Sequence, residues 1–203
     1  EKGYPGDVIH IDPPWEGNWE KYGCDTIDLE WDKKAFPNPE EMIKKLHEMN
    51  FKLSLWINPY IEPDTKLWDL IKDKLLKSEK GGKAVPISDC QTVEKAGIPD
   101  LFDQEGYERF KNILKEKVLR YADVIKADYG EGVPYDGLSS KLRGEELHNL
   151  FLLYYMKAVY EATKEVKGYG IVWGRSGYTG VWQYPLQWGG DTPSSWEGLR
   201  QAI

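Results

Sequence analysis

Short apolar runs recur along the chain and are mostly bounded by Gly, Pro, Asn or Asp. Each run is rich in Val, Ile, Leu or Trp, a composition typical of parallel strands that are buried on both faces. We therefore predict strands at Asp7–Ile11, Lys52–Ile57, Ala122–Ala127, Gly170–Trp173 and Tyr184–Trp188.

Stretches with the apolar spacing of amphipathic helices lie between most of these predicted strands. One of them places Ile43 and Met49 on its apolar face, with Asn38 as a possible cap at its start. The predicted helices are Pro39–Met49, Asp64–Leu76, Tyr107–Tyr121 and Glu145–Val166. Residues 78–102 have no clear period, so we expect a loop excursion there.

The alternation of strands and helices predicts an α/β fold with parallel strands joined by right-handed crossovers. Without a Gly-rich phosphate loop, the pattern fits either a doubly wound sheet or part of a (β/α)8 barrel. Asp12, Asn58, Asp128, Arg175 and Asp191 each stand at or just past the end of a predicted strand. In a barrel these ends form the active-site face, so we favour a (β/α)8 TIM barrel.

Composition and charge narrow the possible ligands. The 203 residues include nine Trp and thirteen Tyr, whose flat rings can stack on sugars, although an aromatic core explains the count equally well. The net charge of −7 argues against a nucleic-acid partner, and no apolar run is long enough for a membrane helix. We expect Cys24 and Cys90 to be reduced thiols, and the scattered histidines indicate no metal site.

Two of the strand-end carboxylates are candidates for catalysis. Asp128 lies in the segment VIKADYGEG and Asp191 in LQWGGDTP, and carboxylates from two strands suit cleavage of a glycosidic bond. The plain alternative for each is a helix cap or a structural ion pair. Lys126 lies on the same strand face as Asp128, where its charge would keep that carboxylate ionised. The glycines before Asp191 let the backbone approach a ligand, and Trp188 can form a wall.

Other residues at the strand ends are candidates for holding the substrate. Arg175 in WGRSG can donate to sugar hydroxyls or orient a carboxylate, unless it forms a salt bridge at the barrel rim. Asp12 in HIDPPW can accept from sugar hydroxyls, unless it serves only to form a turn. Trp56 in LWINPY is either a pocket wall or a core residue.

The segments HIDPPW, VIKADYGEGVP, GRSGYTG and YPLQWGGD, together with the stretch from DLEWD to INPYI, resemble glycoside hydrolase family 31 in their order and spacing. The resemblance implies a retaining α-glycoside hydrolase that uses no metal or organic cofactor. By motif, Asp128 matches the nucleophile and Asp191 the general acid/base. The residues that match the sugar-holding subsite are Asp12, Trp56, Lys126, Arg175 and Trp188.

The resemblance also predicts a partial domain. Residues 1–203 would hold about strands two to six of the barrel with their helices, the rest of the barrel and flanking β-domains being expected in the full-length protein. Because an open barrel exposes two strand edges, we expect the isolated chain to be poorly active and prone to aggregate.

The form KADYGE around Asp128 looks more like the α-xylosidases of the family than its α-glucosidases. We therefore expect a terminal α-xyloside or α-glucoside as the substrate, with α-xylosidase activity favoured. An α-glucosidase, an α-transglycosylase and an inactive carbohydrate-binding relative are the alternatives. The compartment is left open, with the cytoplasm favoured.

Overall fold

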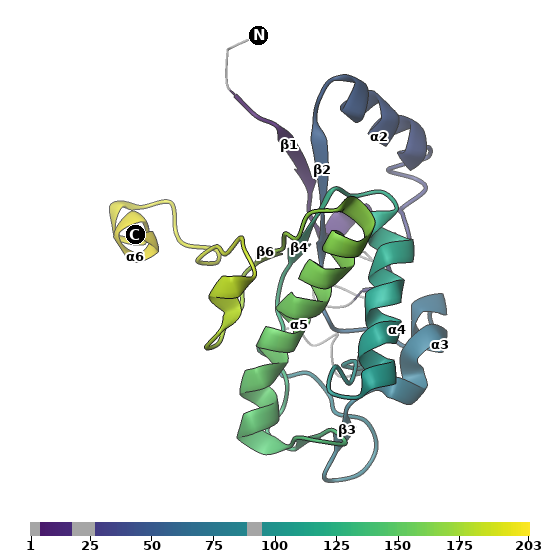
Figure 1. Ribbon diagram of the computed structural model, residues 1–203, viewed down its shortest axis with the longest axis vertical. Helices are drawn as coiled ribbons and strands as arrows, with labels where there is room; N and C mark the ends of the chain where they lie inside the picture. The colour runs from purple at the N-terminus through teal and green to yellow at the C-terminus, as the bar shows by residue number, and fades with distance from the viewer. Residues whose placement is uncertain (1–4, 18–26, 89–94) are drawn as a thin grey trace.

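A computed structural model describes residues 5–17, 27–88 and 95–203 of the chain. Its main sheet contains four parallel strands, hydrogen-bonded in the order β1, β2, β4 and β6 (Figure 1). Their bounds are Val8–Ile11, Lys52–Ile57, Val124–Ala127 and Trp173–Gly174. A separate antiparallel pair joins β3 (Lys77–Ser78) to β5 (Gly137–Leu138). The parallel sheet confirms the predicted α/β class.

The last predicted strand lies beside β6. Trp188 N donates to Gly174 O at 3.0 Å, and Gly174 pairs in parallel with Gln187. The described strands therefore form an open sheet, which does not close into a barrel. In β2 every residue after Lys52 is buried, as predicted. The same prediction is wrong for β1, where Val8 is 48% exposed and Ile9 is 38% exposed, because no described strand covers its outer edge.

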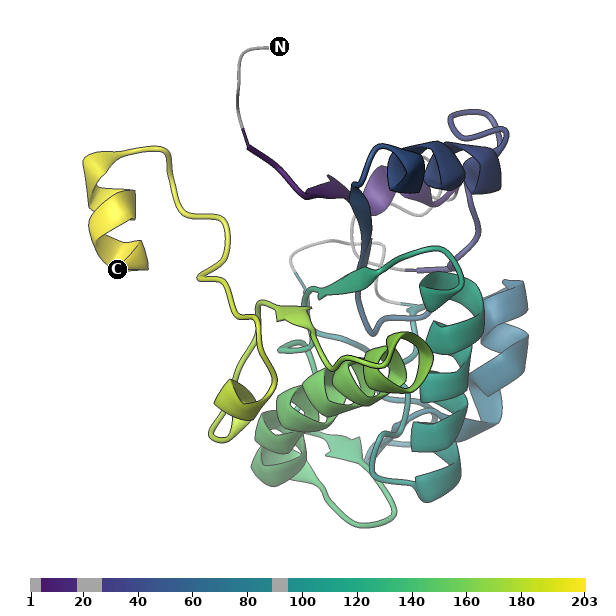
Figure 2. The ribbon, with the colours of Figure 1, turned by 45° about the horizontal axis from the view of Figure 1, so that its top comes forward.

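Helices connect the strands and pack on the sheet. Figures 1 and 2 show the two long helices α4 and α5 side by side, and α5 also packs on β4. The helices α2, α3, α4 and α5 span Pro39–Glu48, Lys66–Ile71, Gln104–Leu114 and Gly144–Lys167. The Asp103 carboxylate caps α4 by accepting from Gly106 N at 2.9 Å, and Gly168 ends α5 with a left-handed φ of 80°.

Some helix ends differ from the prediction. The helix expected at Tyr107–Tyr121 starts earlier, and its last part is the π-helical turn η4 (Lys115–Leu119). Met49 is 59% exposed, because α2 ends at Glu48 and leaves Met49 as its C-cap. Asn38 occupies the N-cap position of α2, but its side chain makes no capping hydrogen bond.

Shorter elements complete the described chain. The helical turns η1, η2 and η5 span Pro13–Trp15, Lys72–Lys74 and Val181–Gln183. Helix α6 (Trp196–Ala202) lies away from the sheet in Figure 2. In the segment expected as a loop excursion, residues 78–88 and 95–102 are hydrogen-bonded to the rest of the fold, for example by Ile87 N to Gly132 O at 2.7 Å. Cys24 and Cys90 lie outside the described residues.

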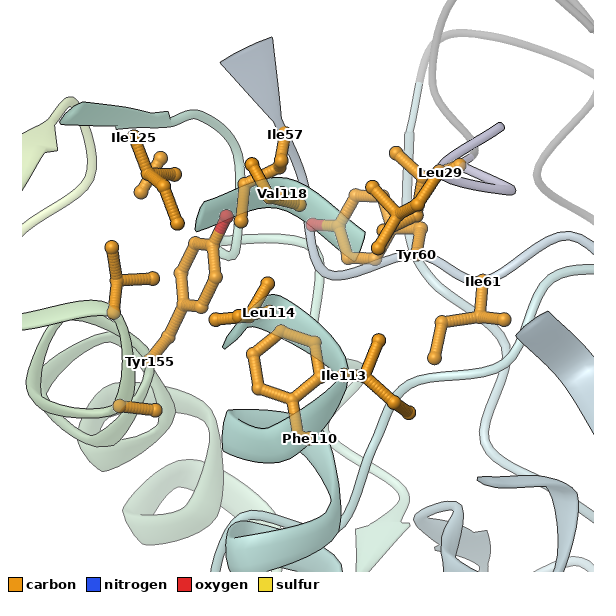
Figure 3. Close-up of a cluster of buried hydrophobic side chains, with 14 of the residues drawn as sticks. Leu29, Ile57, Tyr60, Ile61, Phe110, Ile113, Leu114, Val118, Ile125 and Tyr155 are labelled. Carbon is orange, nitrogen blue, oxygen red and sulfur yellow. The ribbon is translucent and has the colours of Figure 1, made fainter. Parts of the chain in front are cut away.

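The core lies between the sheet and the helices. Ile57 and Ile125 from the strands meet Phe110 and Leu114 from α4, and all are at most 1% exposed. Figure 3 shows Tyr60 and Tyr155 within the same cluster of buried side chains. This apolar layer holds the helices against one face of the sheet. The polar residues of interest lie at the strand ends, outside this layer.

A buried carboxyl pair, Glu16 and Asp28, lies beside this core. Glu16 Oε2 accepts from the backbone N–H groups of Asp28 at 2.8 Å and Leu29 at 2.7 Å. Burial raises the pKa of Glu16 well above its ordinary value, and the nearby Asp28 raises it further. Burial also raises the pKa of Asp28. Glu16 is therefore held in its protonated form over a wider pH range in the folded protein than in the unfolded chain.

We expect Glu16→Gln to stabilise the protein at neutral and alkaline pH and to have little effect near pH 4. An acid whose pKa is raised on folding binds more protons in the folded state, so its stabilising effect is lost as pH rises above the unfolded pKa of about 4.3. The Gln amide oxygen can still accept from Asp28 N and Leu29 N. Thermal unfolding of the full-length protein across pH tests this, with exposed Glu48→Gln as the control. A gain that does not change with pH would contradict it.

Candidate active site

The carboxyl ends of the strands meet along one edge of the sheet. Asp12 follows β1, Asp128 follows β4 and Arg175 follows β6. In the strand register Ile57 pairs with Ala127, and Ala127 pairs with Gly174. Asp128 and Arg175 directly follow the paired residues Ala127 and Gly174 on neighbouring strands. These two side chains, predicted at separate strand ends, therefore lie next to each other.

The Asp128 carboxylate is mostly buried and held from both sides. Its side chain is 13% exposed. Trp56 Nε1 donates to Oδ2 at 2.8 Å, while Arg175 Nε and Tyr129 N donate to Oδ1, the latter at 2.8 Å. Trp56 is itself 2% exposed, so it is a core residue whose indole N–H reaches the site. These donors fix the orientation of the carboxylate.

Arg175 joins Asp128 to a second carboxylate. Its Nη1 lies 2.8 Å from Glu131 Oε1, and Ser176 Oγ donates to Glu131 Oε2 at 2.7 Å. Burial acts to lower the pKa of Arg175, but the hydrogen bonds and charges of Asp128 and Glu131 outweigh it and raise that pKa. The guanidinium is therefore a permanent cation that orients Asp128.

The loop after Asp128 has an unusual backbone that Tyr60 supports. Tyr129 has a φ of 54°, a left-handed conformation that bulky residues rarely adopt. The Tyr60 hydroxyl accepts from Gly130 N at 3.2 Å and from Gly132 N at 2.7 Å. The guanidinium of Arg175 stacks over the Tyr129 ring at 4.8 Å. These contacts hold the loop in the conformation that brings Tyr129 N to Asp128.

We expect Tyr60→Phe to lower the free energy of unfolding by about 1–3 kcal/mol, because it leaves two backbone N–H groups without their acceptor. Tyr155→Phe is a matched control. Tyr155 is equally buried, but its hydroxyl has no hydrogen-bond partner among the described residues. Removing that hydroxyl should cost little or stabilise the protein. Denaturant unfolding of both full-length variants tests this, and equal losses would contradict it.

Asp12 lies in a second polar cluster, with His10 and Lys126. Its Oδ1 atom is 2.8 Å from His10 Nε2 and 2.9 Å from Lys126 Nζ. Burial acts to raise the pKa of Asp12, but the hydrogen bonds and charges of His10 and Lys126 outweigh it and lower that pKa. Asp12 is 55% exposed, so part of its carboxylate remains open to a ligand.

Lys126 is enclosed by aromatic rings. Its Nζ lies 4.8 Å from the centre of the Trp188 ring and 5.4 Å from that of Trp173. Lys126 forms its ion pair with Asp12, not with Asp128. Lys126 and Asp128 do share a strand face, but the long Lys126 side chain reaches Asp12 beyond β1, and Arg175 is the cation on Asp128.

The other two strand-end residues differ in exposure. Asn58 is fully buried, and its Oδ1 accepts from Tyr60 N at 2.9 Å, so it supports its own loop. Asp191 is exposed. It follows Gly190, where a Cβ atom would lie 3.6 Å from Cδ of Arg175. The backbone just before Asp191 thus passes against the side chain that orients Asp128.

Sequence reasoning missed several residues of this site. His10 stands two residues before Asp12, so the same strand alternation that was used for Lys126 would have placed it with Asp12. Glu131, Tyr60 and Trp173 gave no such signal, because their positions depend on loop paths and on which strands are neighbours.

No three His, Cys, Asp or Glu side chains gather as ligands for a metal ion in the described part of the chain. None of the helices in residues 5–17, 27–88 and 95–203 is both long and apolar enough to cross a membrane.

With this geometry in view, the family of the chain is clear. The family model described as the TIM-barrel domain of glycosyl hydrolases family 31 matches residues 1–203. The chain therefore belongs to glycoside hydrolase family 31, and the predicted resemblance and TIM-barrel class are confirmed.

The proteins similar to this chain are named for more than one substrate. The alpha-xylosidase XylQ of Lactiplantibacillus pentosus is 32% identical over 177 residues, which cover 83% of this chain and 22% of that protein. An alpha-xylosidase of Emericella nidulans is 26% identical over 207 residues, covering 100% and 26% of the two chains. The solved structure of a family 31 sulfoquinovosidase from E. rectale, in complex with an aza-sugar inhibitor, matches with a TM-score of 0.71 and 28% identity. The match covers 81% of this chain and 26% of that one. The chain spans about a quarter of the length of these relatives.

Proposed function

We propose that this chain forms the active-site face of a retaining α-glycoside hydrolase, in which Asp128 is the nucleophile and Asp191 the general acid/base. The observation that carries the proposal is the setting of Asp128. Its carboxylate lies at a strand end, is 13% exposed, and is oriented by Trp56 and by the permanent cation of Arg175. A nucleophilic carboxylate needs to be directed in this way.

The reaction proceeds in two steps. An Asp128 oxygen attacks the anomeric carbon while Asp191 protonates the departing glycosidic oxygen, which gives a glycosyl ester on Asp128 and a free alcohol. Asp191, now ionised, takes a proton from water as that water attacks the same carbon, which releases the sugar and restores both carboxyl groups. Each step inverts the anomeric centre, so the net result is retention.

The exposure of Asp191 suits its proposed role. An acid/base residue exchanges a proton with the leaving group in one step and with water in the next, so it needs solvent access. Asp128 makes no such exchange and is held by fixed donors on both oxygens. Asp12, Lys126, Arg175 and Trp188 would hold the sugar around these two carboxylates. Trp56 is 2% exposed, so it would act on the sugar only through its hydrogen bond to Asp128.

The sugar most favoured is a terminal α-linked xylose. Support comes from the KADYGE segment and from the names of the two curated relatives at 32% and 26% identity. An α-glucosidase or an α-transglycosylase on the same site remains the alternative within the family. An inactive carbohydrate-binding relative is disfavoured, because both proposed catalytic carboxylates are present.

The test is hydrolysis by the full-length enzyme of 4-nitrophenyl α-D-xyloside and α-D-glucoside, with the first-formed sugar anomer followed by NMR. We expect the α-anomer first and a higher kcat/KM on the xyloside. Dependence of turnover on an added sugar acceptor would indicate a transglycosylase instead. No turnover of either substrate, or the β-anomer as first product, would contradict the proposal.

A further inference from the structure

A chain of two hydrogen bonds runs from the buried Ser54 through His10 to the exposed carboxylate of Asp12. His10 Nε2 lies 2.8 Å from Asp12 Oδ1, and His10 Nδ1 lies 3.0 Å from the hydroxyl of Ser54 on the neighbouring strand β2. Ser54 is fully buried, so it is no nucleophile despite the Ser–His–Asp arrangement. The His10 ring also meets Trp173 edge to face, with 4.9 Å between ring centres.

The donors and acceptors in this chain can be assigned. The pKa of Asp12 is lowered, so its carboxylate is ionised and can only accept. His10 Nε2 must therefore donate to Oδ1, and in the neutral ring Nδ1 is left to accept from the Ser54 hydroxyl. The hydrogen bond at one ring nitrogen sets which tautomer is present at the other. Asp12 therefore selects the neutral tautomer with its N–H at Nε2, and the Ser54 hydroxyl completes the chain by donating to Nδ1.

This arrangement leaves one side of Asp12 open. His10 and Lys126 both bind Oδ1, and no described residue makes a hydrogen bond to Oδ2. The His10 N–H and the Lys126 ammonium restrict the rotation of the carboxylate. The backbone of Asp12 is also held, because it directly follows β1. A ligand hydroxyl that donates to Oδ2 meets an acceptor that is already oriented, so less entropy is lost on binding.

We infer that His10, anchored at Nδ1 by Ser54, is a positioning residue that holds Asp12 ready to accept from a sugar hydroxyl. The inference rests on the proposed glycosidase function, because it takes Asp12 as part of the sugar-holding subsite. Lys126 alone would neutralise Asp12 without fixing its rotation, since an ammonium is a flexible point charge. The planar His10 ring, held between Ser54 and Trp173, supplies the direction.

The experiment compares His10 variants of the full-length enzyme on the same two nitrophenyl glycosides. His10→Phe keeps the ring and its contact with Trp173 but removes both hydrogen bonds. We expect KM to rise about tenfold, the scale of one hydrogen bond to a charged group, with kcat changed less than about threefold. His10→Gln offers an amide N–H in place of Nε2–H and should restore most of the loss. Ser54→Ala should raise KM by only about threefold.

A double-mutant cycle tests whether His10 acts through Asp12. In an Asp12→Ala background, His10→Phe should change KM by less than about twofold, because the group that it positions is gone. His47→Phe is the matched control. His47 Nε2 also lies 2.8 Å from an aspartate, Asp123, but at the opposite end of the sheet, so KM and kcat should not change.

The outcomes separate the two proposals. If the wild-type enzyme is active but His10→Phe leaves KM unchanged, or His10→Gln is as impaired as His10→Phe, the positioning role is wrong. The positioning role is also wrong if the KM of the double variant rises by the full product of the increases that His10→Phe and Asp12→Ala cause singly. A wild-type enzyme that cleaves neither glycoside would contradict the proposed function and this role together.

Discussion

Replacing Asp128 by Asn in the full-length enzyme is expected to lower turnover of every glycoside by a factor of roughly ten thousand or more, the scale of losing a covalent nucleophile. The Asn amide is nearly isosteric and can still accept from Trp56, but it cannot form the glycosyl ester. It also leaves Arg175 with one carboxylate partner, Glu131, in place of two. The loss should be equal on substrates with good and poor leaving groups.

Asp123→Asn provides a matched control at the other end of the same strand. Asp123 precedes β4 as Asp128 follows it, and its side chain is 8% exposed. Its Oδ2 accepts from Leu53 N and contacts His47, contacts that stabilise the strand ends far from the site. We expect Asp123→Asn to reduce stability but to leave turnover per folded molecule unchanged. Similar kcat losses in both variants would mean that Asp128 is structural.

Replacing Asp191 by Ala is expected to give a loss that depends on the leaving group. Substrates with a poor leaving group, such as a disaccharide, need the proton in the first step and should lose about a hundred- to ten-thousandfold in kcat/KM. Aryl glycosides with an acidic phenol need little protonation, so their kcat/KM should fall by less than about tenfold. Their glycosyl ester should then accumulate, because the base for the second step is missing.

Two measurements complete this test. A plot of kcat/KM against leaving-group pKa for a series of aryl glycosides should be steeper for Asp191→Ala than for the wild type. Rapid mixing should show a burst of phenol followed by slow turnover in the variant. Equal losses on all leaving groups, with no burst, would remove Asp191 from the acid/base role.

Much of the sheet could be predicted because its signal is local. The apolar runs that form β2 and β4 are short and bounded by polar residues, and their carboxyl ends are marked by Asn58 and Asp128. Neighbouring parallel strands bring such ends together whatever the helices do. The placement of Asp12, Asp128 and Arg175 along one edge of the sheet therefore followed from the strand pattern alone.

The pairing of side chains within the site could not be predicted in the same way. Strand alternation gives the face on which Lys126 lies, but not which carboxylate its long side chain reaches. The support of Tyr60 for the Asp128 loop depends on a left-handed backbone at Tyr129, which no sequence pattern marks. Similarly, the exposure of β1 depends on which strands cover its edge, a property of the assembled sheet.

The most direct test of the account is to trap the glycosyl ester that it places on Asp128. The full-length enzyme would be incubated with a fluorinated α-xylosyl donor that reacts in the first step but is slow in the second, then digested with trypsin. We predict that mass spectrometry finds one sugar on the peptide of residues 127–141, and that fragmentation places it on Asp128. A label on Glu131, on Asp136 or on any other peptide would contradict the assignment of the nucleophile.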